Sequence, residues 1–226
     1  IIRHYKKKKI KFYQASSSEM FGKSKPPQNE KTLFQPRSVY AISKVFAYHS
    51  VIHYRDAYAL HACNGILFNH ESPRRGVNFV TKKIVQGLVR IKQGKQKMLI
   101  LGNLYSRRDW GHANDYVESM WNILQQKKAN DFVIATKTSN SVKDFINICA
   151  KKLNIKLNWK NKGLKEIAIN KLTNKTIIKV DQKYFRETEV DNLVGDFSKA
   201  RRLLKWKPKY SFDKLIDDMI NNELND

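Results

Sequence analysis

Cysteine is almost absent from this sequence of 226 residues, which contains only Cys63 and Cys149. The two residues lie far apart and neither belongs to a CxxC motif, so the pattern disfavours a disulfide framework and a cysteine-based zinc site. Cysteine used this sparingly fits a reducing compartment. We therefore expect a cytoplasmic protein that holds no metal ion.

Long apolar runs are also missing from the sequence. The longest runs, such as residues 66–68 and 98–101, are far too short to span a bilayer. The N-terminal segment is basic at residues 6–9, but the apolar stretch that would make it a secretory signal does not follow. The sequence therefore predicts no membrane partner.

Acidic residues are few, with 20 Asp and Glu against 44 Lys and Arg, which gives a formal net charge of +24. Such a charge favours salt-sensitive binding to nucleic-acid phosphates. The basic residues are spread along the chain, however, and no zinc knuckle or aromatic RNA-binding signature accompanies them. We predict no nucleic-acid partner, and we attribute the charge to a drift of composition toward Lys, Asn and Ile.

The sequence contains enough apolar residues, at 41%, to build a sizeable core in one large domain or two small ones. Its periodicity predicts strands that alternate with helices in the first half, which indicates an α/β fold. Ser141 is a predicted helix N-cap. The predicted strands are 10–15, 63–69, 97–101 and 131–135, and the predicted helices are 38–58, 79–93, 115–125, 142–153, 198–204 and 212–224.

Two of these helices have a marked apolar pattern. In the segment 38–58, apolar residues and histidines recur at spacings of three and four. In the segment 115–125, the pattern places five side chains on one face. The recurring residues are Val39, Ile42, Val45, Phe46, His49, Ile52 and His53 in the first helix, and Tyr116, Val117, Met120, Trp121 and Leu124 in the second.

Tyr40 and Lys44 form a Tyr-x-x-x-Lys motif in the first predicted helix. The i, i+4 spacing places both side chains on one helix face, one turn apart. An ammonium group beside a phenol stabilises the phenolate, so such a tyrosine can act as a base near neutral pH. Because Lys is abundant in this sequence, the motif alone is equally typical of a solvated pair on a helix.

The residues that precede this motif strengthen the catalytic interpretation. A predicted strand ends in Ser16 to Ser18, and Glu19 follows directly. A hydroxyl group at the carboxyl end of a parallel strand faces the crevice in which α/β folds bind ligands. Ser17, Glu19, Tyr40 and Lys44 therefore form a candidate catalytic set. The alternative is that Ser17 is a capping residue and Glu19 a surface carboxylate.

A strand that ends in Ser and precedes Tyr-x-x-x-Lys resembles the short-chain dehydrogenase/reductase superfamily. The detailed resemblance is to the GDP-mannose 4,6-dehydratase family, it covers nearly all of the chain, and its segments 64–76 and 108–117 are specific to that family. The segments that carry it are FYQASSSEMFG at 12–22, PRSVYAISK at 36–44, NGILFNHESPRRG at 64–76, FVTKKI at 79–84, RDWGHANDYV at 108–117, DFVIAT at 131–136 and YFRETEVDNLVGD at 184–196.

The resemblance implies a fold of two lobes. Residues 1–78, with contributions from about 107–127, would be the carboxyl-terminal part of an NADP-binding Rossmann domain with a parallel sheet. Residues 79–226 would form mainly a smaller, mixed α/β lobe that binds the nucleotide sugar. The resemblance also implies a homodimer or a homotetramer for the full-length protein.

The resemblance further implies a lyase, specifically a hydro-lyase, that dehydrates GDP-mannose to GDP-4-keto-6-deoxymannose, a precursor of GDP-fucose and other deoxysugars. Tyr40 would remove the proton of the C4 hydroxyl while a hydride passes from C4 to NADP. Glu19 would remove the C5 proton and help water to leave from C6, after which the hydride returns to C6. Ser17 stands where the family has Thr and would keep the hydrogen bond to the C4 oxygen.

Ligand-binding roles carry over from the same family pattern. Lys44, His70 and Arg75 would contact the cofactor, while Asn69 and Arg108 would lie in segments that line the nucleotide-sugar site. Arg186 and Glu189 belong to a carboxyl-terminal segment that would close over the nucleotide. This segment departs from the family pattern after the arginine, where Glu187 and Thr188 replace Pro and Ala.

The nine glycines of the sequence form no G-x-G-x-x-G motif or related Gly-rich loop. That loop allows the backbone to approach the cofactor pyrophosphate, and the resemblance places it upstream of Ile1. We therefore expect a fragment that lacks the N-terminal part of the enzyme, is inactive alone and binds NADP poorly. The predicted strands 10–15 and 63–69 would keep unpaired edges.

Two alternatives to this function remain open. One is a related nucleotide-sugar 4,6-dehydratase or 4-epimerase. Glu19 favours dehydration, because an epimerase removes no C5 proton, and Ser18-Glu19 differs from the Asp-Glu pair that is typical of glucose dehydratases. The other alternative is an inactive remnant that keeps the four candidate catalytic residues but cannot hold NADP.

Overall fold

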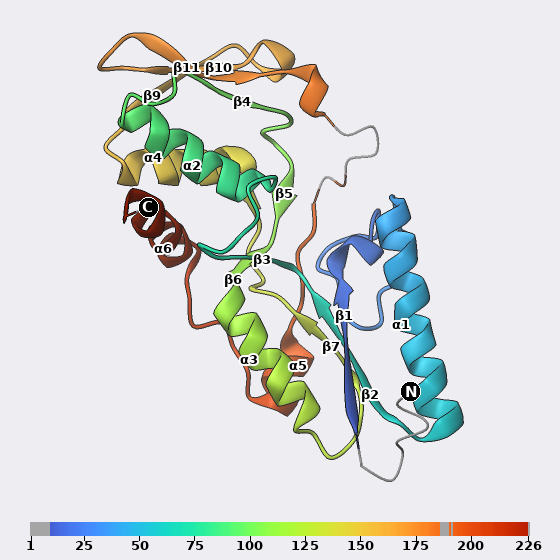
Figure 1. Cartoon of the computed structure of the whole chain (residues 1–226). Coiled ribbons are helices and arrows are strands. Elements are labelled where there is room, and N and C mark those ends of the chain that lie inside the picture. The colour runs from blue at the N-terminus through green and yellow to red at the C-terminus, as the bar shows by residue number, and fades with distance from the viewer. Residues whose placement is uncertain (1–9, 186–189, 191, 226) are drawn as a thin grey trace. The chain divides into compact units, whose positions relative to one another are not determined.

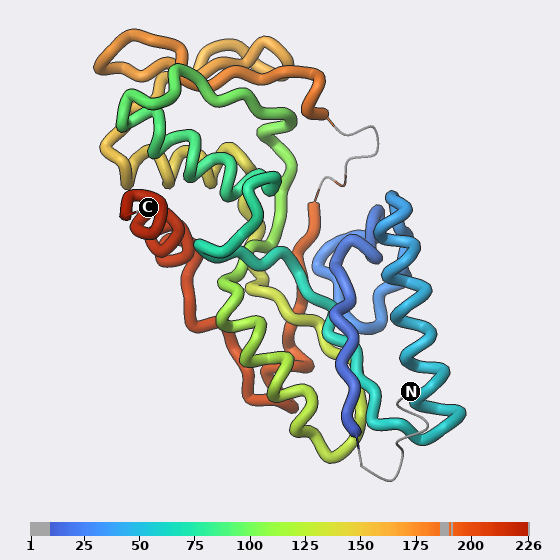
Figure 2. The backbone as a smooth tube through the Cα atoms, in the orientation of Figure 1, coloured from blue at the N-terminus to red at the C-terminus, as the bar shows by residue number. Residues whose placement is uncertain are grey.

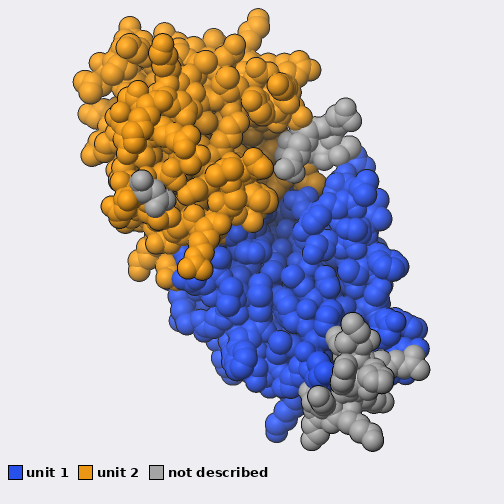
Figure 3. Space-filling view, viewed as in Figure 1, with its two compact units in different colours: residues 1–70, 109–139, 192–209 blue, residues 71–108, 140–191, 210–226 orange. Residues whose placement is uncertain are grey.

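The computed structural model describes residues 10–185, 190 and 192–225, which form two compact units (Figure 3). Unit 1 comprises residues 1–70, 109–139 and 192–209, and unit 2 comprises residues 71–108, 140–191 and 210–226. Each unit is thus built from three separate segments of the chain. The assignment of one lobe to the cofactor and the other to the sugar stays a prediction.

Unit 1 contains a parallel three-stranded sheet in the order β1-β2-β7, with β1 at Lys11–Ser17, β2 at His61–Leu67 and β7 at Asp131–Ile134. Helix α1 (Val39–Tyr58) covers one face of this sheet, and α3 (Ala113–Leu124) and α5 (Ser198–Leu204) cover the other (Figures 1 and 2). The predicted α/β fold with a parallel sheet is confirmed.

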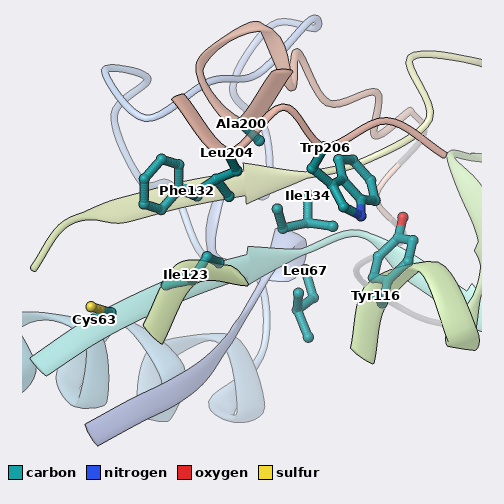
Figure 4. Close-up of a cluster of buried hydrophobic side chains, with 9 residues drawn as sticks. All are labelled: Cys63, Leu67, Tyr116, Ile123, Phe132, Ile134, Ala200, Leu204 and Trp206. Carbon is teal, nitrogen blue, oxygen red and sulfur yellow. The ribbon is translucent and has the colours of Figure 1, made fainter. Parts of the chain in front are cut away.

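The central strand β2 is buried on both faces, which explains why its sequence is apolar without alternation. Figure 4 shows Cys63 and Leu67, two alternate residues of β2, within the core that α3 and α5 share with the sheet. On the opposite face, the side chain of Asn64 donates from Nδ2 to the backbone oxygen of Tyr48 in α1, at 3.4 Å. The remaining residues of the core cluster are Tyr116, Ile123, Phe132, Ile134, Ala200, Leu204 and Trp206.

The two edges of this sheet differ. At the β7 edge, a carboxylate oxygen of Glu30 accepts a hydrogen bond from the backbone nitrogen of Val133 at 2.8 Å. At the opposite edge, no strand within the described ranges pairs with the outer side of β1. The expectation of an unpaired edge therefore holds for β1, but it is wrong for β2, which is paired on both sides.

The packed face of α1 is not the predicted apolar stripe. Ala41, Tyr48 and Val51 are its buried residues, whereas Val39 is 84% exposed and Phe46 is 76% exposed. The helix packs against β1 and β2 with a small residue and a hydroxyl-bearing ring, so the contact does not require the stripe. In α3 the correction is similar, because Val117 and Trp121 are exposed while Tyr116 is buried.

Unit 2 contains a mixed sheet in the order β4-β11-β10-β9, in which β4 and β11 are parallel and the other pairs are antiparallel. Three helices accompany this sheet, and α2 packs against the other two helices and β4. The elements are β4 (Leu99–Leu101), β9 (Leu157–Lys160), β10 (Ile167–Asn170), β11 (Lys175–Val180), α2 (Val80–Lys92), α4 (Val142–Lys152) and α6 (Phe212–Asn225).

Two residues explain how the helices of unit 2 begin and pack. The predicted N-cap Ser141 is confirmed, and it forms a reciprocal capping box with Asp144 at the start of α4. In α2, a Cβ atom at Gly87 would lie 2.9 Å from Cδ1 of Leu99, so glycine allows the helix to approach β4 closely.

Several short elements escaped prediction. The segment after the predicted strand 63–69 contains β3 (Asn69–Glu71), which pairs with β6 (Trp110–His112), and β5 (Arg107–Arg108) pairs with β8 (Asn140–Ser141). The described residues also include the 3-10 helices η2 (Ser18–Met20), η3 (Gly163–Lys165) and η4 (Gln182–Tyr184). Of the helices that the structure describes, none is long and apolar enough to cross a membrane.

Candidate active site

The end of β1 positions the first two candidate catalytic residues. Ser17 is the last residue of β1 and the N-cap of η2, and its Oγ accepts a hydrogen bond from the backbone nitrogen of Glu19 at 3.2 Å. The neighbouring Ser16 is buried and donates from Oγ to Oδ1 of Asn64 at 3.1 Å. Ser17 and Glu19 are therefore fixed relative to one another by a tight turn that follows a strand anchored in the sheet.

Helix α1 brings Tyr40 and Lys44 to the same strand. The Nζ atom of Lys44 donates to the backbone oxygen of Ala15 at 2.8 Å, and it lies 5.7 Å from the centroid of the Tyr40 ring. Ala15 precedes Ser17 by two residues in β1. One lysine thus joins the helix turn that carries the tyrosine to the strand that ends in the candidate serine.

The surroundings of Tyr40 and Lys44 suit a base and a hydroxyl-binding group. Tyr40 is 54% exposed, so its phenol is accessible to a ligand. Lys44 uses one N–H of its ammonium group on Ala15 and makes no other hydrogen bond in the described part of the chain. The two remaining N–H groups are suited to hydrogen bonds with ribose hydroxyls.

Ser17 and Leu67 are register partners at the carboxyl ends of the parallel strands β1 and β2. Asn69 and His70, which follow β2, therefore lie at the same end of the sheet as Ser17. Nδ1 of His70 lies 2.9 Å from the backbone oxygen of Phe68, and its ring stacks on Tyr116 with centroids 4.8 Å apart. Since a carbonyl oxygen only accepts, Nδ1 carries the proton in the neutral ring. Oδ1 of Asn69 is buried without a hydrogen-bond partner among the described residues.

Arg75 and Arg108 belong to unit 2 and differ in their surroundings. Arg108 is buried, and its Nη1 donates to the backbone oxygens of Arg107 at 2.9 Å and Val190 at 2.6 Å. Arg75 forms an ion pair with Glu71, with 2.9 Å between Nε and Oε2. Arg108 therefore supports the local backbone. The predicted residues Arg186 and Glu189 lie outside the described residues.

Asp109 is a buried residue that sequence reasoning missed. Its carboxylate accepts bonds from the backbone nitrogens of Thr136, Lys137 and Gly195, at 2.8, 2.9 and 3.2 Å, and from Oγ1 of Thr136 at 2.6 Å. Burial raises the pKa of Asp109 to about 6, against the opposing effect of these bonds. This residue joins the segment after β7 to the segment at Gly195. Asp109 lies in the family-specific stretch 108–117, and this position is the sequence feature that could have pointed to it.

A second missed group anchors α1 to the sheet. Arg55 donates from Nη1 and Nη2 to the two carboxylate oxygens of Asp131, at 2.9 and 2.7 Å. Asn64 donates to the same carboxylate from its backbone nitrogen and from Nδ2. Burial by itself would raise the pKa of Asp131, but the bonds from Arg55 and Asn64 hold it below its usual value. No sequence signal linked these residues.

The family model described as GDP-mannose 4,6 dehydratase matches residues 1–219 of the chain. The chain is 50% identical over 218 residues to the GDP-mannose 4,6 dehydratase of Dictyostelium discoideum, a match that covers 96% of this chain and 61% of the relative. It is 53% identical to GDP-mannose 4,6 dehydratase 1 of Arabidopsis thaliana, covering 95% of this chain and 55% of that protein. The chain therefore spans little more than half the length of these curated relatives.

Solved structures share the fold at low sequence identity. RMD from Pseudomonas aeruginosa complexed with NADPH superposes with a TM-score of 0.80 at 19% identity, covering 95% of this chain and 67% of that chain. The dTDP-glucose 4,6-dehydratase of Bacillus anthracis in complex with NAD gives a TM-score of 0.79 at 19% identity, covering 100% of this chain and 65% of that chain. These likenesses support the Rossmann-type fold.

Proposed function

The chain belongs to the GDP-mannose 4,6-dehydratase family, and from this premise we propose that the protein carrying it dehydrates GDP-mannose to GDP-4-keto-6-deoxymannose. The observation that supports the proposal most directly is the bond from Lys44 to the backbone of Ala15. This bond joins the Tyr-x-x-x-Lys helix to the strand that ends in Ser17 and is followed by Glu19. The four residue types that the reaction needs thus belong to one corner of unit 1.

In this proposal Tyr40 acts as a phenolate base that takes the proton of the C4 hydroxyl. Ser17 donates a hydrogen bond to the C4 oxygen and holds it during oxidation. The 4-ketone acidifies C5, and Glu19 removes the C5 proton and passes it to the hydroxyl group that leaves C6 as water. The proton that Tyr40 took then returns to C5 when C6 receives the hydride. A nicotinamide cofactor held by Lys44, His70 and Arg75 would supply the hydride acceptor for C4 and the hydride donor for C6, so the reaction would be redox-neutral overall.

The residues present suit the ribose hydroxyls and a phosphate of a nicotinamide dinucleotide. Lys44 offers two N–H groups, which suit ribose hydroxyls, and Arg75 offers a guanidinium, which suits a phosphate. His70 is held by Phe68 and Tyr116, and it would contact the cofactor. The sequence offers no Gly-rich loop for the pyrophosphate. We propose NADP as the cofactor, with weak binding to this chain alone.

Asn69 would line the nucleotide-sugar site, since its Oδ1 is buried and unpaired among the described residues. Arg108, Arg186 and Glu189 are proposed for the same site by family pattern. We also propose a cytoplasmic enzyme that assembles as a homodimer or homotetramer and uses neither nucleic acid nor membrane as a partner.

The test joins this chain to the part of the Dictyostelium relative that it does not match, and measures formation of the 4-keto product. We expect Tyr40→Phe to abolish turnover while GDP-mannose binding stays close to normal. Tyr54→Phe is the matched control, because Tyr54 is an exposed tyrosine on the same helix. Product formation by Tyr40→Phe at a rate near that of the unmodified protein would refute the role of Tyr40.

Glu19→Gln separates the two halves of the reaction. Oxidation at C4 should continue, while elimination across C5 and C6 should stall, so bound reduced cofactor should accumulate after mixing. Absorbance at the reduced nicotinamide band measures it in stopped flow. Normal product release by this variant would show that another residue removes the C5 proton. A 4-epimerase would give an epimerised nucleotide sugar and no 4-keto product.

A further inference from the structure

Glu71 is a buried carboxylate in unit 2 that the proposed reaction does not use. It is the last residue of β3 and is only 2% exposed. Its Oε2 accepts a hydrogen bond from Oγ1 of Thr81, in the first turn of α2, at 2.6 Å. The same oxygen lies 2.9 Å from Nε of Arg75. One carboxylate thus joins the end of a strand, the following turn and the start of a helix.

A carboxylate in this position is costly to the fold. Burial raises the pKa of Glu71 to about 7, against the opposing effects of Arg75 and Thr81. A neutral amide of the same shape would accept the Thr81 bond with a smaller desolvation cost. What a carboxylate adds at this position is its charge toward Arg75.

Arg75 is held on two sides. Its Nε forms the ion pair with Glu71, and the guanidinium carbon lies 3.4 Å from the centroid of the Phe79 ring, on which the plane stacks. Nε lacks a hydrogen bond of good alignment, so the contact with Glu71 is electrostatic. A carboxylate at one edge and a ring against one face together fix the plane of the guanidinium.

The outer edge of Arg75 is unused. Neither Nη atom has a hydrogen bond within the described part of the chain, and the side chain is 22% exposed. Arg55 differs, because both of its Nη atoms bind Asp131. A guanidinium with a fixed plane and two donors at one edge is suited to paired bonds with phosphate oxygens.

We propose that Glu71 is a positioning residue, which with Phe79 and Thr81 fixes the Arg75 guanidinium so that its Nη groups receive a phosphate of the nicotinamide cofactor. This inference rests on the cofactor role proposed for Arg75. Glu71 itself touches no ligand, and its effect on binding passes entirely through Arg75.

The experiment observes Arg75 directly in the 226-residue chain by NMR. The Nε–Hε signal of Arg75 is assigned with Arg75→Lys, and NADP⁺ is then titrated to millimolar concentration, where weak binding is visible. We expect a resolved Nε–Hε signal whose proton exchanges slowly with water and whose chemical shift changes as NADP⁺ is added. Glu71→Gln keeps an acceptor for Thr81. In this variant the Arg75 Nε–Hε proton should exchange rapidly with water. The apparent dissociation constant of NADP⁺ should rise at least about fivefold, equivalent to about 1 kcal/mol.

Glu166→Gln is the matched control for a merely structural effect. Glu166 is also buried in unit 2, and it also binds one cation and one hydroxyl, with Lys143 Nζ at 2.6 Å and Tyr105 OH at 2.7 Å. Its replacement should leave both the Arg75 signal and NADP⁺ binding unchanged. Equal effects of the two replacements on the Arg75 signal would overturn the positioning role of Glu71.

A double-mutant cycle completes the test. In the Arg75→Lys background, Glu71→Gln should cause no further loss of NADP⁺ affinity, because the route through the guanidinium is already removed. A further loss of NADP⁺ affinity as large as the loss that Glu71→Gln causes in the unmodified chain would overturn the inference. An Arg75 signal that ignores NADP⁺ in the unmodified chain would overturn the phosphate assignment. The dehydration assay with Tyr40→Phe is independent of all these measurements, so failure of the proposed function is seen separately.

Discussion

Helices α1 and α2 both carry or adjoin candidate site residues, but they are held in opposite ways. In α2 the apolar residues Ile84, Val85 and Leu88 are fully buried. In α1 the apolar residues Val39 and Phe46 are among the most exposed of the described part. The apolar residues of α2 gather on one face of the helix, whereas those of α1 are spread more evenly around it, so the two helices differ in pattern as well as in outcome.

The difference lies in what each helix packs against. Helix α2 meets α4, α6 and β4, whose apolar side chains belong to the same unit. Helix α1 packs against β1 and β2, it buries Ala41, Tyr48 and Val51, and its far end is anchored by the Arg55–Asp131 ion pair. Periodicity predicts an amphipathic helix, but it does not tell which face the rest of the chain covers.

The largest expected effect is on the packed helix. Leu88→Ala removes a fully buried side chain from α2 and should lower the free energy of unfolding by about 2 to 5 kcal/mol. Urea denaturation followed by circular dichroism measures the change. A loss below about 1 kcal/mol would show that α2 is not packed as closely as the structure indicates.

The second prediction compares the carboxylates near the two helices. Burial raises the pKa of Glu71, before α2, to about 7, so the folded protein keeps this proton up to a higher pH than the unfolded chain does. Its contribution to stability should therefore be greatest at low pH and be lost as pH rises toward 7, by up to about 3 kcal/mol. Asp131, beneath α1, has a lowered pKa and acts in the opposite direction, since its contribution is lost as the solution becomes acidic.

Glu71→Gln isolates the first of these two effects. Unfolding free energies measured by urea at pH 5, 6 and 7 should decrease less steeply in this variant than in the unmodified chain. A decrease should remain, because the pKa of Asp109 is also raised by burial, to about 6. An unchanged slope would show that Glu71 does not titrate in this range.

A smaller effect is expected at the start of α1. Oγ of Ser38 accepts a hydrogen bond from the backbone nitrogen of Ala41 at 3.1 Å, whereas Phe79 at the start of α2 supplies no side-chain cap. Ser38→Ala should lower the free energy of unfolding by about 1 kcal/mol. Thermal unfolding measures the loss, and an effect near zero would show that water replaces the cap.

Much of the fold was predictable because its signals are local. The six predicted helices lie within two residues of those observed, and Ser141 caps α4 as predicted. The short strands β5, β6 and β8 gave no periodic signal, since two or three residues cannot show one. The contacts of Glu71 with Thr81 and of Asp109 with Gly195 join distant residues, so only the structure shows them.

The candidate site also has parts that local sequence signals predict and parts that only the structure shows. The spacing of Tyr40 and Lys44 indicated one helix face, and the structure adds the bond of Lys44 to Ala15, which no spacing rule contains. Arg108 was predicted beside the nucleotide sugar, and in the structure it is buried and bound to backbone oxygens. Roles in catalysis and binding stay predictions until the variants are measured.

The smallest expected effect is on the exposed stripe of α1. Phe46 is 76% exposed, so Phe46→Glu should change the free energy of unfolding of the monomer by no more than about 0.5 kcal/mol. Leu88→Glu is the buried counterpart and should prevent stable folding. Since exposed apolar side chains promote association, Phe46→Glu should also reduce light scattering at high protein concentration. A loss above about 2 kcal/mol that grows with protein concentration would show that Phe46 is buried between molecules in solution, and the contrast between the two helices would then disappear.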